Sequence, residues 1–186
     1  MSKRLTIKQD ENCESPRTSC DNVWTFACWH NKYHLGDIQP KNQPSEFIEG
    51  LSEGTIIRSI FAYEHGNITI SLAEFSCPWD SGQVGYAYVT PEKIKEEYGD
   101  GPEALQKALN YLEGEIRVYD DYLQGNCWMY KVEEGTPCQC CDHIEYEMVD
   151  SCGGFIGDDL ERTGLKDYLT GFTPEEITEA WDKRFN

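Results

Sequence analysis

The sequence predicts an α+β fold, in which a twisted, mostly antiparallel β-sheet carries a long central helix and C-terminal helices packed on one face. Three observations support this prediction. Runs rich in β-branched and aromatic residues, most clearly 55–64 and 67–75, flank a two-residue turn, as the strands of a hairpin do. Apolar residues recur at steps of three and four over 102–124, which is typical of one long helix. A further helix-start signal follows the last strand, at Thr173.

The first part of the chain alternates strands with turn-rich segments. The run 5–9 is a candidate edge strand, and VWTFACW at 23–29 is the first firm strand. Two prolines exclude regular structure from 38–45, and Ser45 is placed to cap a short helix over 46–52. These elements lead into the hairpin over 55–75.

Helix boundaries are well marked in the middle of the chain. After a strand at 84–90, Thr90 as the N-cap and a proline at the first helical position predict a short helix that stops at Gly99. The central helix starts at 100–103 and ends at Gly125. The residues expected on its buried stripe are Leu105, Ala108, Leu109, Leu112, Ile116, Tyr119 and Leu123.

The last third of the chain predicts one more hairpin and two helical segments. Strands are expected at 127–133 and 143–150. The second alternates apolar and acidic residues, as a half-buried antiparallel strand with one charged face does. A glycine-rich turn separates it from a helical turn at 160–169 and from a final amphipathic helix.

The domain organisation follows from length and composition. At 186 residues the chain suits a flexible N-terminal segment over 1–22, where turn-forming residues dominate, and a single α+β domain over 23–186. The basic N-terminus lacks an apolar core, and no apolar run approaches the ~18 residues of a membrane span, so neither a signal peptide nor a membrane partner is expected. Nine cysteines, an odd number at irregular spacing, indicate reduced thiols in a cytoplasmic setting.

Charge is the most unusual property of the sequence. The chain has 34 acidic and 16 basic residues, a net charge of −18, which disfavours direct binding to nucleic acid. It favours a cationic partner, which is a basic protein surface, metal ions, or both. Neither Lys nor Arg occurs between Val132 and Glu161. A face that only aids solubility is the alternative interpretation. The carboxylates expected to bind a partner are Glu113, Glu115, Asp120, Asp121, Glu133, Glu134, Asp142, Glu145, Glu147, Asp150, Asp158 and Asp159.

A cluster of thiols and one imidazole is the candidate metal site. Zinc prefers thiolate and imidazole ligands. The spacing C-x-C-C-x-H is unfavourable, because adjacent cysteines on a strand point to opposite faces. Reduced cysteines in a hairpin loop, with no cofactor, are therefore the alternative to a zinc site. The candidate ligands are Cys138, Cys140, Cys141, His143 and Cys152.

The sequence carries no recognisable catalytic motif. It lacks a P-loop, a Rossmann glycine pattern and a nucleophile elbow. His30 and His34 lie at the end of a strand and in a loop, where they are best interpreted as polar loop residues, one of them bonded to a carboxylate. We therefore expect no catalytic residues and no enzyme, with an enzyme acting on a host nucleotide signal as the least favoured alternative.

Three segments resemble a known group of proteins: CWHNKYHLGD (28–37), CPWDSGQVGYAYVTPEKIKEEYG (77–99) and YLEGEIRVYDDYLQG (111–125). They are similar to small acidic proteins of unassigned function that bacteriophages and integrated elements of bacteria carry. The resemblance covers residues 22–170 and implies action in the cytoplasm of a bacterial host cell. Small acidic phage proteins often block host defences, such as RNA-guided CRISPR nucleases, whose DNA channels are strongly basic.

The predicted function combines the charge with this resemblance. We expect a phage-encoded, anti-CRISPR-like inhibitor that binds a basic nucleic-acid-binding host protein, such as an RNA-guided CRISPR nuclease, through its acidic residues and so mimics DNA. A zinc-stabilised protein-binding module without DNA mimicry is the alternative.

Overall fold

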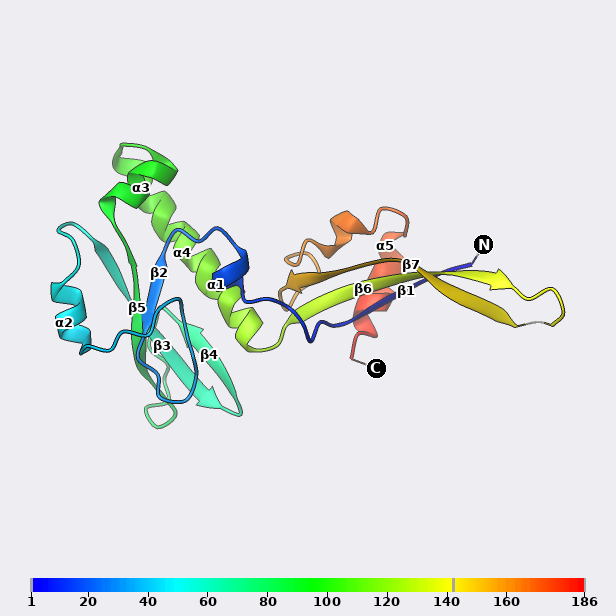
Figure 1. Ribbon diagram of the computed structural model, residues 1–186, viewed down its shortest axis with the longest axis horizontal. Coiled ribbons are helices and arrows are strands. Elements are labelled where there is room, and N and C mark those ends of the chain that lie inside the picture. Colours follow the sequence, from blue (N-terminus) through cyan, green and yellow to red (C-terminus); the bar gives the residue numbers. More distant parts are fainter. Residues whose placement is uncertain (1, 142, 186) are drawn as a thin grey trace. The chain divides into compact units, whose positions relative to one another are not determined.

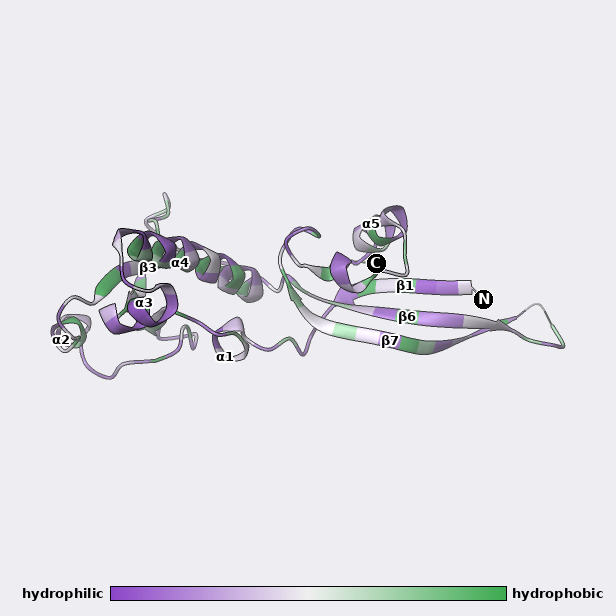
Figure 2. Cartoon of the chain, turned by 90° about the horizontal axis from the view of Figure 1, so that it is seen from above, coloured by the Kyte–Doolittle hydropathy of each residue, from purple (hydrophilic) through white to green (hydrophobic). Residues whose placement is uncertain are grey.

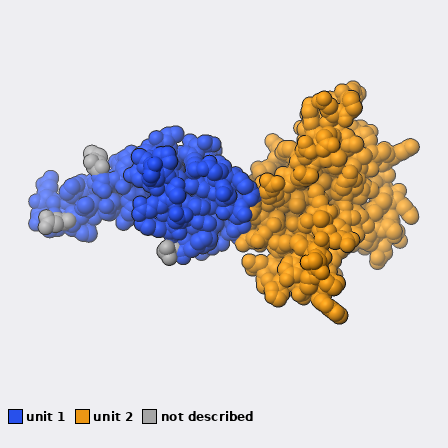
Figure 3. Space-filling view, turned by 180° about the vertical axis from the view of Figure 1, so that it is seen from behind, with its two compact units in different colours: residues 1–14, 125–186 blue, residues 15–124 orange. Residues whose placement is uncertain are grey.

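A computed structural model of the chain describes residues 2–141 and 143–185. It divides the chain into two compact units, which Figure 3 colours separately. Unit 1 comprises residues 1–14 and 125–186, and unit 2 comprises residues 15–124. Each unit contains helices and an antiparallel sheet, so the predicted α+β class is confirmed. Among the described residues, no helix is both long enough and apolar enough to cross a membrane.

This division differs from the expected flexible segment over 1–22 followed by one domain over 23–186. Residues Ser2–Gln9 form strand β1, which pairs antiparallel with a strand more than a hundred residues later, Leu5 lying opposite Val132. The predicted single sheet is therefore two sheets. The candidate edge strand at 5–9 is therefore part of β1. Its pairing with a distant strand was not predicted, because such pairing leaves little trace in local composition.

Unit 2 is built on a four-stranded antiparallel sheet with strand order β2-β5-β3-β4. The predicted hairpin is formed by β3 and β4, which turn at Gly66, a glycine with φ 86°. A Cβ at Gly85 would lie 2.4 Å from the carbonyl oxygen of Ala27, so glycine is needed where β2 meets β5. The elements of this unit are α1 (Pro16–Ser19), β2 (Thr25–Cys28), α2 (Pro44–Glu49), β3 (Ile56–His65), β4 (Asn67–Ser71), β5 (Ser81–Val89), α3 (Pro91–Tyr98) and α4 (Pro102–Leu123).

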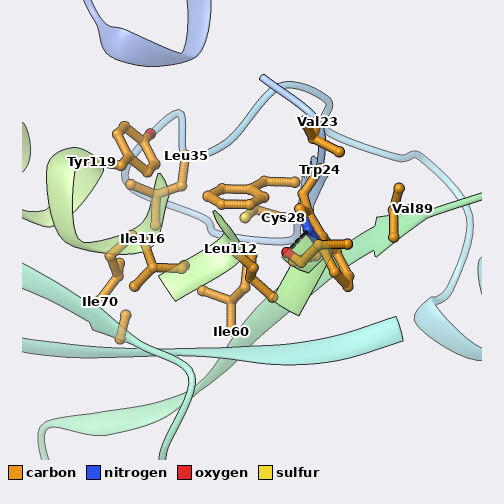
Figure 4. Packing of buried hydrophobic residues seen from close by; sticks show 14 of the residues in the cluster. Val23, Trp24, Cys28, Leu35, Ile60, Ile70, Val89, Leu112, Ile116 and Tyr119 are labelled. Atoms are coloured by element: carbon orange, nitrogen blue, oxygen red, sulfur yellow. Dashed lines mark hydrogen bonds between the residues drawn. The ribbon is translucent and has the colours of Figure 1, made fainter. Parts of the chain in front are cut away.

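Helix α4 supplies one side of the core of unit 2 (Figure 4). Trp24 and Leu112 are each 1% exposed, and the Trp24 indole nitrogen donates a hydrogen bond of 2.8 Å to the carbonyl of Ala108 on α4. Most of the predicted stripe is buried here, but Leu105 is 40% exposed and Leu109 and Leu123 are only partly buried. The buried stripe of α4 therefore contains fewer residues than the helical periodicity of the sequence predicts.

Unit 1 is built on a three-stranded antiparallel sheet with strand order β1-β6-β7. Helix α5 lies on one side of this sheet against β1 (Figure 2), and its Thr173 and Glu176 form a capping box. Trp128 is the centre of the core: it is 1% exposed and stacks edge-on against Trp181, their ring centroids 5.2 Å apart. The other elements are β6 (Cys127–Pro137), β7 (Ile144–Ile156), the 3-10 helix η1 (Leu165–Tyr168) and α5 (Pro174–Asp182).

The β6–β7 hairpin extends past the end of β1 (Figure 1). Strand β1 reaches only as far as Gly135, whereas β6 and β7 stay paired up to Pro137 and Ile144. We call residues 136–145 the hairpin tip. Strand β7 was expected to be half-buried, but Ile144 is 38% and Met148 57% exposed. The expectation was wrong for this part of β7 because the strand joins the core only near its end, at Cys152 and Phe155.

Candidate functional site

The predicted partner-binding carboxylates form one group in unit 2, on α4, and one group in unit 1. Those on α4 serve mostly to hold the fold together. Glu115 is only 9% exposed. Its Oε1 accepts hydrogen bonds from the backbone N–H groups of Val23 and Trp24, at 2.8 and 3.2 Å. Its Oε2 lies 2.6 Å from Arg17. Glu115 is therefore an internal anchor and not a partner-binding residue, which corrects the prediction.

Arg17 is the cation that neutralises this anchor, and it was not predicted from sequence. Its side chain is 3% exposed and donates two hydrogen bonds to Asp37, at 2.9 and 2.6 Å. The remaining donors reach Glu115, the amide oxygen of Asn22 and the carbonyl of Trp24. All five guanidinium N–H groups are thus used inside the unit, as a buried cation requires.

The other carboxylates of α4 differ in exposure. Asp121 is 6% exposed, so it too is withdrawn from any partner surface. Asp120 is half-buried and accepts hydrogen bonds from the backbone N–H of Ile70 and from Gln124. Burial raises the pKa of Asp120 above its ordinary value. Glu113 alone of the four is fully on the surface.

In unit 1, the carboxylates of β6 are neutralised by neighbouring cations. Glu133 is 7% exposed and forms ion pairs with Lys131 and Arg4, at 2.6 and 2.7 Å. The hydrogen bond from Lys131, followed by that from Arg4, lowers the pKa of Glu133. Glu134 lies 3.4 Å from Lys3. The prediction that Glu133 binds a partner is wrong, because the side chain is enclosed and already paired.

The carboxylates of β7 behave differently along the strand. Asp150 accepts a hydrogen bond of 3.0 Å from the Tyr130 hydroxyl. Burial, reinforced by Asp150, raises the pKa of Tyr130 to about 12. Glu145 and Glu147 are exposed, and no ion pair joins either to another of the residues that the structure describes.

The remaining predicted carboxylates lie beyond β7 or outside the description. Asp158 forms an ion pair with Arg162. Asp159 accepts a hydrogen bond of 2.8 Å from the backbone N–H of Glu161 and helps to shape the turn after β7. Asp142, although predicted to bind a partner, lies outside the described residues.

Some of the carboxylates that were predicted to bind a partner lie on an exposed surface of β7, where a partner can reach them. We define the hairpin surface as Glu145, Glu147, Met148 and Val149. Met148 is 57% and Val149 51% exposed, so exposed apolar side chains directly follow Glu147 along the strand. Glu147 is also directly opposite Glu134 in the β6–β7 register. Like charges directly opposite each other destabilise a sheet, so a contribution to folding stability does not explain why a glutamate is present at position 147.

The hairpin tip gathers three of the predicted metal ligands. The thiols of Cys138, Cys140 and Cys141, which we call the tip thiols, lie within 4.8 Å of one another. The Cys138 and Cys140 sulfurs are 3.1 Å apart. These residues lie in the loop between β6 and β7, so the alternation of side chains along a strand, which argued against the site, does not apply. The tip thiols could therefore hold a metal ion.

The other two predicted ligands are not part of this group. The backbone carbonyl of His143 accepts a hydrogen bond of 2.8 Å from the Cys138 N–H, but the His143 ring is not among the clustered ligand atoms. Cys152 lies opposite Tyr130, eight residues along β7 from Ile144, or roughly 27 Å at ~3.4 Å per residue. Its inclusion in the metal site was wrong, because β7 carries it away from the tip.

The thiols at the tip differ in acidity. The backbone N–H of Cys140, followed by its side chain, lowers the pKa of Cys138 to about 7. The pKa of Cys140 is raised by its hydrogen bond with Cys138, since one thiolate suppresses ionisation of the other. By contrast, burial raises the pKa of Cys28 in the core of unit 2 to about 12.

This difference predicts the pH dependence of alkylation in reduced, metal-free protein. Cys138 is unreactive as a thiol and reactive as a thiolate, so its modification by iodoacetamide should rise through a midpoint near pH 7. Peptide mass spectrometry after short exposures checks this at the single-residue level. Cys28 should stay unmodified over the same range. A midpoint for Cys138 near that of an ordinary cysteine, about 8.5, would contradict the prediction.

The predicted roles of the loop histidines can also be compared with the structure. The Nδ1 of His30 accepts hydrogen bonds from the backbone N–H groups of Lys32 and Tyr33, so the proton resides on Nε2, which lies 2.9 Å from Glu64. The bond to His30 lowers the pKa of Glu64. This is the bonded polar loop histidine that the sequence favoured.

The chain was also compared with known proteins. No model of a protein family, no curated protein and no solved structure matches it.

Proposed function

We propose that this chain is a non-enzymatic binding protein that docks its β6–β7 hairpin on a basic, nucleic-acid-binding surface of another protein. The observation that supports this most is the hairpin surface. Glu145 and Glu147 are exposed, without a cationic partner among the described residues, and two exposed apolar residues, Met148 and Val149, follow them along β7. Uncompensated charge next to apolar area suits an interface whose partner supplies Lys or Arg.

The wider charge distribution favours the same kind of partner. Each unit has 17 acidic and 8 basic residues, so a negative potential surrounds both units rather than one. Such a potential repels the phosphates of nucleic acid and accelerates encounter with a positively charged protein. Binding to the protein that holds the nucleic acid is therefore favoured over binding to the nucleic acid itself.

The proposed mechanism is competition for phosphate-binding residues. Carboxylates on the β6–β7 hairpin would occupy Lys and Arg side chains that otherwise contact DNA or a guide RNA. The sequence resemblance to phage proteins would make a host defence nuclease, such as an RNA-guided CRISPR nuclease, the partner. Unlike the prediction from sequence, this proposal rests on the hairpin and does not use the buried carboxylates Glu115, Asp121 and Glu133.

A displacement assay tests the proposal. Labelled duplex DNA is bound to an RNA-guided nuclease, and fluorescence anisotropy follows its release as the chain is added. We expect release at low salt that weakens strongly between about 0.05 and 0.3 M salt, because screening acts on exposed charges. No release at low salt, or release that is independent of salt, would count against competition by charge.

A zinc-stabilised binding module without mimicry is the second candidate, and the tip thiols are the observation that favours it. In that case a chelator would lower the melting temperature and abolish partner binding together. If the hairpin carboxylates carry binding, chelator should leave the displacement of DNA unchanged.

A further inference from the structure

The loop at the hairpin tip is shaped by backbone hydrogen bonds on both sides of its three cysteines. Pro137 and Ile144 form the last pair of the β6–β7 ladder, and the Cys138 N–H closes the loop on the carbonyl of His143. Adjacent cysteines in such a loop are not forced apart by strand geometry. The chain reversal thus directs three sulfurs to one point on the surface.

The sulfur separations match those of a thiolate-bound metal. With metal–sulfur bonds of about 2.3 Å, the sulfurs of a tetrahedral site lie about 3.8 Å apart. The tip thiols span this value: one pair is separated by 3.1 Å, and all three sulfurs lie within 4.8 Å. Shifts of less than about 1 Å, well within rotamer adjustment of exposed side chains, would complete the geometry.

We propose that Cys138, Cys140 and Cys141 together bind one thiophilic d10 cation, such as Zn²⁺ or Cu⁺, through three thiolates at an open site. This inference is independent of the proposed docking function. Cys140 and Cys141 are exposed, so a fourth coordination position faces solvent and is available to water or to a donor from another molecule. Soft thiolate ligands select these cations over Mg²⁺ or Ca²⁺.

The site differs from a structural zinc centre in its position. The tip thiols belong to neither hydrophobic core. An ion bound there orders the loop and leaves the two sheets and their cores as they are. Metal binding should therefore change the environment of the tip with little change in the free energy of unfolding, unlike a structural zinc site that supplies folding energy.

Titration of the reduced full chain with Co²⁺ tests the site, because thiolate-bound cobalt absorbs strongly in the near ultraviolet. We expect one equivalent to bind, with subsequent displacement by Zn²⁺ or Cu⁺. The double variant Cys140→Ser/Cys141→Ser should lose at least about tenfold in affinity, since removing ligands weakens a chelate site. The matched control is Cys20→Ser, which removes an exposed cysteine in unit 2 and should bind like the wild type.

Three results would overturn the proposal. One is equal cobalt absorption in wild type and the tip double variant, which would place the ligands elsewhere. A second is absence of thiolate–cobalt absorption in fully reduced wild-type protein. Intact mass under the titration conditions identifies a disulfide by the loss of two hydrogens, and a tip that stays oxidised in excess reductant would also exclude the metal site. Circular dichroism verifies that each variant is folded.

Discussion

Replacing Arg17 by methionine should lower the free energy of unfolding by about 3–5 kcal/mol, because it leaves buried carboxylates without their cation. Asp37 and Glu115 both depend on this guanidinium, and Glu115 also orders the backbone at Val23 and Trp24. Methionine preserves much of the apolar packing of the side chain, whose guanidinium lies 3.7 Å from the centre of the Phe26 ring. Urea denaturation followed by tryptophan fluorescence measures the change.

The matched control is Arg58→Met, since Arg58 is exposed and, among the described residues, its side chain donates only to the carbonyl of Ile57. That substitution should change stability by less than about 0.5 kcal/mol. A double variant, Arg17→Met/Glu115→Gln, should be less destabilised than the sum of the single changes, because the two residues interact directly. Equal effects at Arg17 and Arg58 would show that the buried network is not needed for stability.

The second large effect is expected at Trp128 in unit 1. Trp128→Ala should cost about 3–5 kcal/mol through lost apolar burial and the cavity that remains. The indole nitrogen also donates a hydrogen bond of 2.7 Å to the carbonyl of Gly157, which would lose its donor. Hydrogen exchange should show the loss of protection in β6, and in α5 through Trp181.

Trp79→Ala provides the same chemical change at a side chain that is 91% exposed. Its effect should stay below about 0.5 kcal/mol, because little apolar area is buried there. A difference of less than about 1 kcal/mol between the two tryptophan variants would contradict the assignment of Trp128 to the centre of a core.

Local signals account for what the sequence predicted well. Thr90 and Thr173 cap α3 and α5 as expected, since each precedes a proline at the first helical position and accepts a backbone hydrogen bond in the first turn. The β3–β4 hairpin was also predicted, because its turn and its β-rich strands are contiguous. These features depend on residues within a few positions of one another.

Long-range pairing accounts for what was missed. Arg17 lies in a segment of turn-forming residues, and its partner Glu115 is 98 residues away, so composition gave no reason to join them. The same applies to Arg4 and Glu133, which are 129 residues apart. Counting charges therefore placed buried and exposed carboxylates in one group, although only partner positions in three dimensions separate them.

The thiol cluster illustrates a rule of strand geometry that was applied to residues of a loop. The residues were recognised from sequence, but adjacent cysteines were judged by the geometry of a strand. The structure ends β6 at Pro137 and starts β7 at Ile144, so the tip thiols lie in the intervening loop and converge. The predicted strands, 127–133 and 143–150, also left these cysteines in a loop, so the rule for adjacent residues on a strand did not apply to them.

The central claim is that binding to a basic partner depends on the hairpin surface and not only on the net charge of the chain. Charge reversal in the displacement assay tests this claim most directly. The variant Glu145→Lys/Glu147→Lys is compared with Glu49→Lys/Glu53→Lys, an equal charge change at exposed positions of unit 2. We predict that the hairpin variant loses at least about tenfold in its ability to release DNA from the nuclease, and the control less than about threefold. Equal losses in both variants would contradict the claim.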